Sequence, residues 1–425
     1  MKKLFLIASV FAVGSFLSAA AAPPDSVQCS PDNGGIKLPK DFCAVVVADS
    51  LGMSRHITVN DNGDVYVALS DANHGGGIAA LRDTNGDGKA DIIKYFGDDT
   101  GTGINLQHGY LYFAPDTGVL RYKMKQGELV PTSTPQTVVK DLPVQHQHSS
   151  KTIAFDDKGW LYVDIGAPSN ACQKQDRTPH SPGMLPCPLL KRHGGVWRFQ
   201  ADKLNQAQSE GERFITGMRN GVALDWNPVD KQLYVVMHGR DQLHDLWPEQ
   251  YSIAQSAELP AEQFFQLEKG DNLGWPFCYY NWMTHKKVIN PEYQGREDKV
   301  GPCSKYEQPI MAFPGHWAPD ALLFYTGKQF PKKYYGGAFI AFHGSWNRAP
   351  KVQQGYKIVF VPFANGKPVG KYSNFAVGFK GREKLDSPEN ARFRPVGLAQ
   401  GPDGSLYIVD SHQGRVWRVL YRGDR

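Results

Sequence analysis

The sequence carries little charge, few cysteines and none of several short motifs that mark large enzyme classes. Charged residues make up 21% of the chain and the formal net charge is only +5, so nucleic acid is not expected as a partner. No Walker loop, GxGxxG, HExxH or GxSxG occurs, so nucleotide-binding and serine-hydrolase functions find no support. The six cysteines include no CxxCH, which excludes a c-type haem attached to this chain.

Long hydrophobic runs are also missing, apart from one at the amino-terminal end. Lys2 and Lys3 precede an apolar run from Leu4 to about Leu17, and four alanines follow Ser18. This pattern predicts a secretory signal peptide over residues 1–22, with an uncleaved anchor as the alternative. We expect residues 23–425 to form one domain in the periplasm, without stable insertion into the membrane.

The cysteine spacing is typical of disulfides, which an oxidising compartment favours over thiolate metal sites. The six cysteines fall into three pairs that are close in sequence, so three local bridges are the simplest of fifteen possible connectivities. Each bridge would hold one loop against a rigid body. The expected pairs are Cys29–Cys43, Cys172–Cys187 and Cys278–Cys303.

A repeated phrase of short strands and tight turns organises the rest of the chain. In its clearest copy, Val396–Gln400 is followed by a turn at Pro402–Gly404, by Leu406–Val409 and by Val416–Val419. These segments are expected to be antiparallel strands, with an aromatic residue in the second one. Six copies can be counted, and their aromatic residues are Tyr66, Tyr112, Tyr162, Tyr234, Phe339 and Tyr407.

Six copies of one phrase predict an all-β fold, a six-bladed β-propeller with loop insertions held by disulfides. A small twisted sheet cannot bury both of its faces alone, and six sheets packed around an axis supply the missing contacts. The long interval before Phe339 is expected to carry an insertion from about Asp241 to Gln308. The segment Phe42–Val47 is expected to complete the last blade and close the ring. A two-sheet sandwich is the alternative, but it does not require six copies.

The repeat also predicts where a site lies. Residues just before the first strand and just after the second strand of each blade share one end of the molecule, because these strands are antiparallel. Arginines and histidines gather at these positions, and such a funnel attracts a small polyanion. The positions are Arg55, His56, His146, His148, Arg219, Asn220, His316, Arg392 and Arg394 before first strands, and Ser70–Asp71, His238–Asp241, His343–Arg348 and Ser411–His412 after second strands.

Each of these residues has a structural alternative. An arginine beside a blade turn often makes a salt bridge or binds a carbonyl, and His148 could be a hydrogen-bonded loop histidine, with His146 as a rival for its role. Arg392 and Arg394 point more strongly to a ligand. Residues i and i+2 of an extended segment point the same way, so this pair could grip two carboxylates.

Four ordered motifs carry a family resemblance. The segments His148–Gly166, Gly217–Asn220, Gly270–Pro276 and Arg392–Val396 resemble the soluble PQQ-dependent glucose/sorbosone dehydrogenase family, quinoproteins that include aldose sugar dehydrogenases. The similarity runs in order from about residue 40 to 420. It implies a pyrroloquinoline quinone (PQQ), a tricarboxylate, held over Ca²⁺ in the mouth of a propeller. It also implies a sugar substrate and electrons passed to an external acceptor, a quinone or a cytochrome.

The resemblance assigns roles to two catalytic residues. His148 falls on the general base that takes the proton of the sugar hydroxyl, and Arg219 falls on the arginine beside the reactive quinone carbonyl. Imidazole suits the first role because its unperturbed pKa is about 6.5. A preorganised arginine suits the second because negative charge grows on the quinone oxygen.

Further residues are assigned to the cofactor by the same resemblance. Arg392 and Arg394 fall on a pair that binds cofactor carboxylates, and Asn220 and His238 on polar contacts. A cofactor-binding lysine of the family has no counterpart, because this chain offers Asn347 and Arg348 in that region.

Two calcium sites are expected. The backbone carbonyls of Gly239 and Arg240 match the family's catalytic Ca²⁺. Separately, a loop with oxygen ligands at alternate positions is typical of a structural Ca²⁺ site, with a plain Asn-Gly turn as the alternative. Its ligands would be Asp83, Asn85, Asp87 and Asp91.

Two other functions remain open at this point. A propeller lactonase or related metal hydrolase would need several acidic or Asn residues at the mouth, where this sequence has mostly Arg and His. A non-catalytic carbohydrate- or protein-binding propeller would tolerate the loss of His148.

Overall fold

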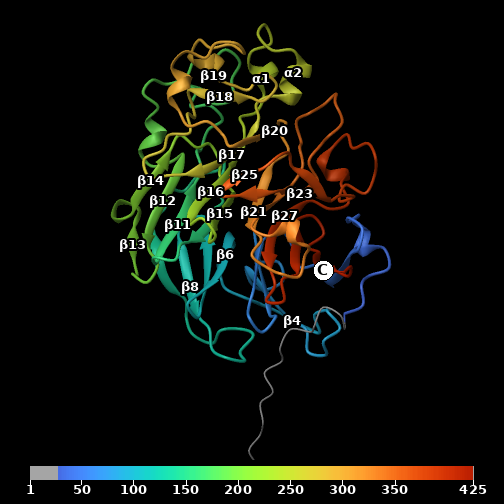
Figure 1. The fold of residues 1–425 in the computed structure, drawn as a ribbon. Coiled ribbons are helices and arrows are strands. Elements are labelled where there is room, and N and C mark those ends of the chain that lie inside the picture. Colours follow the sequence, from blue (N-terminus) through green and yellow to red (C-terminus); the bar gives the residue numbers. More distant parts are fainter. Residues whose placement is uncertain (1–26, 425) are drawn as a thin grey trace, which may run out of the picture.

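Six sheets arranged around one axis form the body of the molecule (Figure 1). The computed structural model describes residues 27–424, so the signal peptide predicted for residues 1–22 lies outside the described residues. In each sheet four strands are antiparallel to their neighbours, and the inner strands lie side by side around the ring. The six-bladed β-propeller predicted from the repeat is therefore confirmed.

Each blade is built from strands that follow one another from the axis outward. The first three blades are β2 (Ser54–Val59), β3 (Val65–Leu69), β4 (Ile78–Arg82) and β5 (Ile92–Phe96); β6 (Gly101–Gln107), β7 (Tyr110–Pro115), β8 (Val119–Lys123) and β9 (Gln136–Lys140); and β10 (Ile153–Phe155), β11 (Trp160–Ile165), β12 (Gly195–Gln200) and β14 (Glu212–Thr216). The short strand β13 (Gln206–Ala207) pairs in parallel with β9.

The other three blades follow the same order. They are β15 (Ala223–Asn227), β16 (Gln232–Met237), β17 (Glu262–Leu267) and β20 (Met311–Phe313); β21 (Pro319–Phe324), β22 (Ala338–Phe342), β23 (Lys357–Val361) and β26 (Ser373–Ala376); and β27 (Pro395–Gln400), β28 (Leu406–Asp410), β29 (Val416–Tyr421) and β1 (Phe42–Ala48). The amino-terminal strand β1 pairs antiparallel with β29. The predicted closure of the ring by Phe42–Val47 is confirmed.

The aromatic residue of each repeat lies in the second strand and packs between blades. Tyr66, Tyr234 and Phe339 are completely buried, and the Tyr66 hydroxyl donates to the carbonyl of Leu129 at 2.9 Å. Aromatic and β-branched side chains suit such a half-buried pleated surface. The core is thus divided into apolar layers between neighbouring sheets, which leaves the axis free.

An open channel of about 230 Å³ follows the axis. Residues of all six inner strands line it, namely those of β2, β6, β10, β15, β21 and β27. Inner strands begin, and second strands end, at one end of this channel, because the two are antiparallel. We call this end the mouth.

Two excursions from the fourth blade lie at the mouth end. One, between β16 and β17, contains the helices α1 (Leu243–Leu246) and α2 (Ile253–Glu258). The other, between β17 and β20, contains the hairpin β18 (Cys278–Asn281) and β19 (Lys286–Ile289). The predicted single insertion is thus interrupted by β17, a strand of the blade itself. Figure 1 shows both excursions together at the top.

Shorter elements complete the described part of the chain. A hairpin joins β24 (Phe363–Ala364) to β25 (Lys367–Pro368). The 3-10 helices span Asn33–Gly35, Pro188–Lys191, Gln208–Glu210, Pro291–Tyr293, Gly301–Lys305, Lys332–Tyr334 and Pro388–Asn390.

The three predicted disulfides are present, as Cys29–Cys43, Cys172–Cys187 and Cys278–Cys303. The second holds the loop between β11 and β12, and the third holds the excursion that carries β18 and β19. Within residues 27–424 we find no helix with the length and apolar character needed to cross a membrane.

Candidate functional site

His148 lies at the mouth in a strained, tightly held conformation. Its backbone is left-handed, with φ 53°. Gly166 makes room for it, because a Cβ at Gly166 would lie 2.7 Å from the His148 Cβ. The ring atom Nδ1 lies 2.5 Å from the carbonyl oxygen of Ala167. A carbonyl only accepts, so Nδ1 carries the hydrogen and Nε2 keeps its lone pair.

The surroundings of His148 keep its ring neutral. Burial, followed by the nearby Arg219 charge, lowers the pKa of His148 to about 3. A neutral imidazole with a bare Nε2 has the protonation state that a general base needs before it takes a proton.

Arg219 is buried beside Asp241. Its Nη2 atom lies 2.7 Å from the Asp241 carboxylate, Nη1 donates to the carbonyl of Gly239 at 2.9 Å, and Nε donates to that of Asn170 at 3.2 Å. Burial alone would raise the pKa of Asp241, but its neighbours, Arg219 above all, lower it well below its ordinary value. Asp241 is therefore ionised and fixes the guanidinium.

A second arginine shares the same carboxylate. Arg177, on the loop closed by Cys172–Cys187, lies 3.1 Å from Asp241 and donates to Gln242 at 2.7 Å. The sequence interpretation missed Arg177. It lies inside the long connection between β11 and β12. This connection joins a second strand to a third strand, which places it at the mouth, and that position was the only indication in the sequence that Arg177 reaches the site.

Three polar atoms near this pair have no hydrogen-bond partner among the described residues. They are Oδ1 of Asn220, Oδ1 of Asn347 and Nδ1 of His238, and all are buried. Other atoms of these residues do make hydrogen bonds: Asn347 Nδ2 donates to the Asp241 carboxylate at 3.0 Å, and the backbone N–H of His238 donates to the backbone carbonyl of Asn220 at 3.0 Å. Unpartnered buried polar atoms are costly, so these atoms fit a site that a polar ligand completes.

Asp320 is the second carboxylate of the mouth, and the sequence interpretation missed it. It lies 3.1 Å from His238 Nε2 and 3.6 Å from His343 Nδ1, and its carbonyl accepts from His56 at 2.8 Å. Burial alone would raise the pKa of Asp320, but His343, His238 and Arg55 lower it well below its ordinary value. It lies in β21, close in sequence to His316. The prediction for this end of the blade considered only Arg and His residues, so it overlooked this carboxylate.

Asp320 adds to one argument from the sequence. The mouth was expected to carry mostly Arg and His, with Asp241 among its predicted positions, and the structure places the carboxylate of Asp320 there as well. Each of these two carboxylates is paired with arginine or histidine, and no group of three or more His, Cys, Asp or Glu side chains in residues 27–424 is arranged to hold a metal ion. The surplus cationic groups still suit an anionic ligand.

The predicted pair Arg392 and Arg394 is not brought together. Arg394 reaches the mouth, where its Nη2 donates to the carbonyl of Gly344 at 2.9 Å. Arg392 is exposed and lies over the Phe393 ring at 5.0 Å. The prediction assumed an extended segment, but the backbone bends at Arg392 and the strand begins only at Pro395, so the two side chains diverge.

Arg348 is also outside the site. Its guanidinium donates to the carbonyl of Gly315 at 3.0 Å and to the Glu258 carboxylate at 2.6 Å, and the residue is completely buried. It therefore holds α2 against the loop after β22 and has a structural role. Its neighbour Asn347 does face Asp241, as described above.

The predicted calcium residues lie in two places. Gly239 and Arg240 follow β16 at the mouth; the Gly239 carbonyl accepts from Arg219, and the Arg240 side chain forms an ion pair with Glu292 at 2.5 Å. The other loop joins β4 to β5, at the end opposite the mouth. There Asp83 accepts backbone N–H groups, and Asp91 accepts from Thr84 and from the Asn85 side chain.

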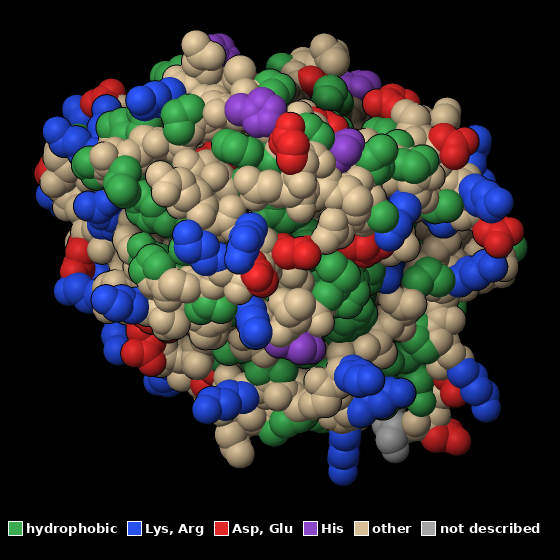
Figure 2. Space-filling view, turned by 90° about the horizontal axis from the view of Figure 1, so that it is seen from above, with side chains coloured by type: hydrophobic (Ala, Val, Ile, Leu, Met, Phe, Trp, Pro, Cys, Tyr) green, Lys and Arg blue, Asp and Glu red, His purple; other side chains and the backbone are tan. Residues whose placement is uncertain are grey.

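Figure 2 looks down on the end that carries α1, α2, β18 and β19. Positive and negative side chains are interspersed over this face. The cationic groups that we describe, such as Arg219, are largely buried beneath it. Selection for an anion therefore depends on the enclosed site and not on a basic outer surface.

A six-bladed propeller with arginines and histidines converging at one mouth defines a class of fold and site. Within that class, the chain belongs to the TrAA12-like family, whose model matches residues 36–422.

One relative that matches most of the chain carries the name of a quinoprotein. The pyrroloquinoline quinone-dependent pyranose dehydrogenase of Coprinopsis cinerea is 22% identical over 453 residues, which cover 95% of this chain and 56% of that protein. The chain spans about half the length of the curated relatives it matches. The quinoprotein resemblance seen in the sequence is thereby confirmed.

Many solved structures share the fold. The holo PQQ domain of the Coprinopsis cinerea pyranose dehydrogenase has a TM-score of 0.72 at 20% identity, covering 91% of this chain and 97% of that chain. The calcium structure of a Trichoderma reesei family AA12 carbohydrate-active enzyme has a TM-score of 0.74 at 18% identity, covering 96% and 99%. At these identities the likeness is evidence of fold alone.

Proposed function

We propose that this protein is a PQQ- and calcium-dependent dehydrogenase that oxidises an aldose or related sugar aldehyde and passes the electrons to a separate acceptor. The observation that carries the proposal is the bare Nε2 of His148 beside the buried Arg219 at the mouth. The PQQ dependence named for the Coprinopsis cinerea relative supports it.

The residues at the mouth fit a polyanionic quinone. Arg219 and Arg394 offer positive charge at the mouth, and charge-assisted hydrogen bonds from guanidinium groups bind carboxylates strongly. The unpartnered Oδ1 atoms of Asn220 and Asn347 only accept hydrogen bonds, so they suit hydroxyl groups or a cation and not the carboxylates. When bound, the quinone supplies a carbonyl carbon that accepts hydride from the sugar.

His148 removes the hydroxyl proton of the sugar through Nε2. The hydrogen bond from Nδ1 to Ala167 holds the ring in the required tautomer. The charge of Arg219 contributes to the low pKa of His148, so an anionic cofactor beside Arg219 would raise that pKa toward its ordinary value. The base then becomes stronger only in the loaded site.

Calcium would be held at the mouth by the backbone carbonyls of Gly239 and Arg240. Hard oxygen ligands of this kind suit Ca²⁺. The Gly239 carbonyl accepts from Arg219 Nη1, and the second lone pair of this oxygen would be available to the ion. We propose a second, structural calcium at the loop of Asp83 and Asp91, which does not enter the chemistry.

Reconstitution tests the function. The purified protein is mixed with PQQ and Ca²⁺, its absorption spectrum is recorded, and reduction of a redox dye is screened across aldoses and sugar aldehydes. We expect a new near-ultraviolet or visible band and sugar-dependent reduction. A protein that binds the quinone but oxidises no sugar would contradict the proposal, and so would one that forms no complex.

We also propose that the protein works outside the cytoplasm. Three disulfides support an oxidising compartment. Sequencing of the mature amino terminus after expression with export tests this, because cleavage near residue 22 is expected.

A further inference from the structure

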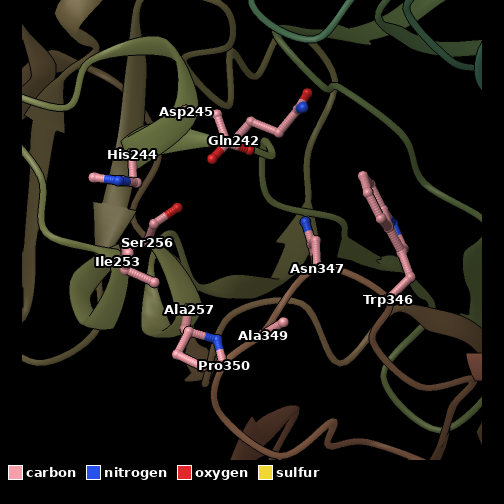
Figure 3. A pocket seen from close by; sticks show the side chains of 10 residues that line it. All are labelled: Gln242, His244, Asp245, Ile253, Ser256, Ala257, Trp346, Asn347, Ala349 and Pro350. Atoms are coloured by element: carbon pink, nitrogen blue, oxygen red, sulfur yellow. The ribbon is translucent and has the colours of Figure 1, made fainter. Parts of the chain in front are cut away.

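A cleft of about 560 Å³ opens beside the mouth, between the excursion that carries α1 and α2 and the loop that follows β22 (Figure 3). Gln242 and Asp245 line the cleft on one side and Ser256 lines it on another. Trp346 and Asn347 lie across from them. The figure shows these side chains around an open space. The cleft is large enough to hold a ligand of its own.

The cleft shares a wall with the proposed reaction site. Asn347 lines the cleft and also donates to Asp241 at 3.0 Å, and Asp241 pairs with Arg219 at 2.7 Å. Neither His148 nor Arg219 is among the described residues that line the cleft. A molecule that reaches His148 and also fills the cleft must therefore extend beyond the reacting unit.

The lining has the chemistry of a carbohydrate site. Trp346 is 53% exposed, although Trp275 and Trp317 are nearly buried. A large exposed indole at a cleft can cover the C–H face of a sugar ring, while Gln242, Asp245 and Ser256 offer hydrogen bonds to hydroxyl groups.

The same lining disfavours an anion. Among its described residues there is neither Lys nor Arg, and Asp245 is exposed. An exposed carboxylate repels carboxylate and phosphate ligands. The quinone is therefore expected in the cationic mouth and not in this cleft, which leaves the cleft to a neutral ligand.

We propose that the cleft is a subsite for a second sugar unit, so that the enzyme oxidises the reducing-end unit of a di- or oligosaccharide while Trp346 stacks on the next unit. This inference rests on the proposed function for the position of the reacting unit, whereas sugar binding in the cleft does not require the cofactor.

A binding experiment without cofactor tests the subsite directly. The cofactor-free protein is titrated with glucose, cellobiose and maltose by calorimetry. We expect one of the disaccharides to bind at least tenfold more tightly than glucose. Trp346→Ala should abolish that difference and Trp346→Tyr should keep most of it. Equal affinities for all three sugars, or disaccharide binding unchanged in Trp346→Ala, would overturn the inference.

A control variant separates the subsite from a general loss of an aromatic side chain. Tyr335 is 39% exposed and lies in the connection between β21 and β22, at the end opposite the mouth. Tyr335→Ala should bind sugars as the parent does. Urea unfolding of the Trp346 variants should match the parent, because the side chain is mostly in solvent.

Kinetics of the reconstituted enzyme distinguish this inference from the proposed function. If Trp346→Ala lowers kcat/KM for a disaccharide tenfold and leaves that for glucose within twofold, the subsite is supported. If both fall equally, the cleft holds the reacting sugar and the inference is wrong. If no sugar is oxidised but disaccharide binding still depends on Trp346, the proposed function is wrong and the subsite stands.

Discussion

The Nη2 atom of Arg219 lies 2.7 Å from the Oδ2 atom of Asp241. The same carboxylate also binds Arg177 and Asn347. One side chain thus joins the fourth blade to the disulfide-closed loop of the third blade and to the loop after β22. A carboxylate shared in this way holds Arg219 in one orientation at the proposed cofactor site.

Asp241→Asn should destabilise the protein and impair turnover. The amide keeps the size of the side chain but leaves the buried Arg219 without its counter-charge. Breaking a buried ion pair in this way costs about 3 kcal/mol, which urea unfolding measures. As a control, Asp403→Asn breaks the Arg418 pair of 2.9 Å at a turn opposite the mouth, and should lower stability without lowering kcat. An Asp241→Asn protein with unchanged stability would contradict the role of Asp241.

His148→Ala should leave quinone affinity within a few-fold of the parent and lower kcat at least a hundredfold, because a positioned base contributes roughly 10² to 10⁴ in rate. Fluorescence titration with PQQ and steady-state dye reduction measure the two effects. The exposed neighbour His146 provides the control, since His146→Ala should keep full turnover. Unchanged turnover in His148→Ala would remove this residue from the mechanism.

Arg394→Ala should weaken PQQ binding at least tenfold, because the guanidinium lies at the mouth and an arginine–carboxylate contact is among the strongest hydrogen bonds. Arg392→Ala should bind PQQ as the parent does, because Arg392 is exposed and lies against Phe393. Equal losses in the two variants would mean that the arginines act as a pair after all.

Arg348→Ala should act on stability. The change removes the donors that Glu258 and the carbonyl of Gly315 now use, and we expect the free energy of unfolding to fall by about 3 kcal/mol. Arg348→Lys should recover only part of it, since one ammonium cannot match the fork of donors. The folded variant should bind PQQ normally, and a selective loss of PQQ affinity would restore Arg348 to the site.

His343 should make stability fall as the pH is lowered. Burial and Arg394 lower its pKa to about 3 from 6.5, so the unfolded chain binds a proton below about pH 6.5 while the folded chain does not. The free energy of unfolding is therefore highest above about pH 6.5 and falls as the pH is lowered below that value. The difference in free energy of unfolding between His343→Asn and the parent should therefore shift by about 3 kcal/mol in favour of the variant between pH 7 and pH 4. Parallel pH profiles of the two proteins would contradict the assignment.

The blades and the three disulfides could be predicted from the sequence alone. Buried aromatic residues such as Tyr66 and Tyr407 recur beside tight turns, the cysteines lie close to their partners in sequence, and Phe42 begins a strand with the right pattern to close the ring. These features follow local rules, because side chains alternate along a strand with a period of two and turns require particular residues.

The contents of the mouth depended on the tertiary structure. A bend of the backbone at Arg392 turns its side chain away from that of Arg394. Glu258 at the end of α2 forms an ion pair with Arg348. Asp320 contacts histidines from three blades. The sequence determined which kinds of side chain reach this end of the ring. Only the packed blades decided which of them pair, because an ion pair such as that of Arg348 with Glu258, 90 positions apart in the sequence, depends on the placement of whole sheets and not on the local pattern of the chain.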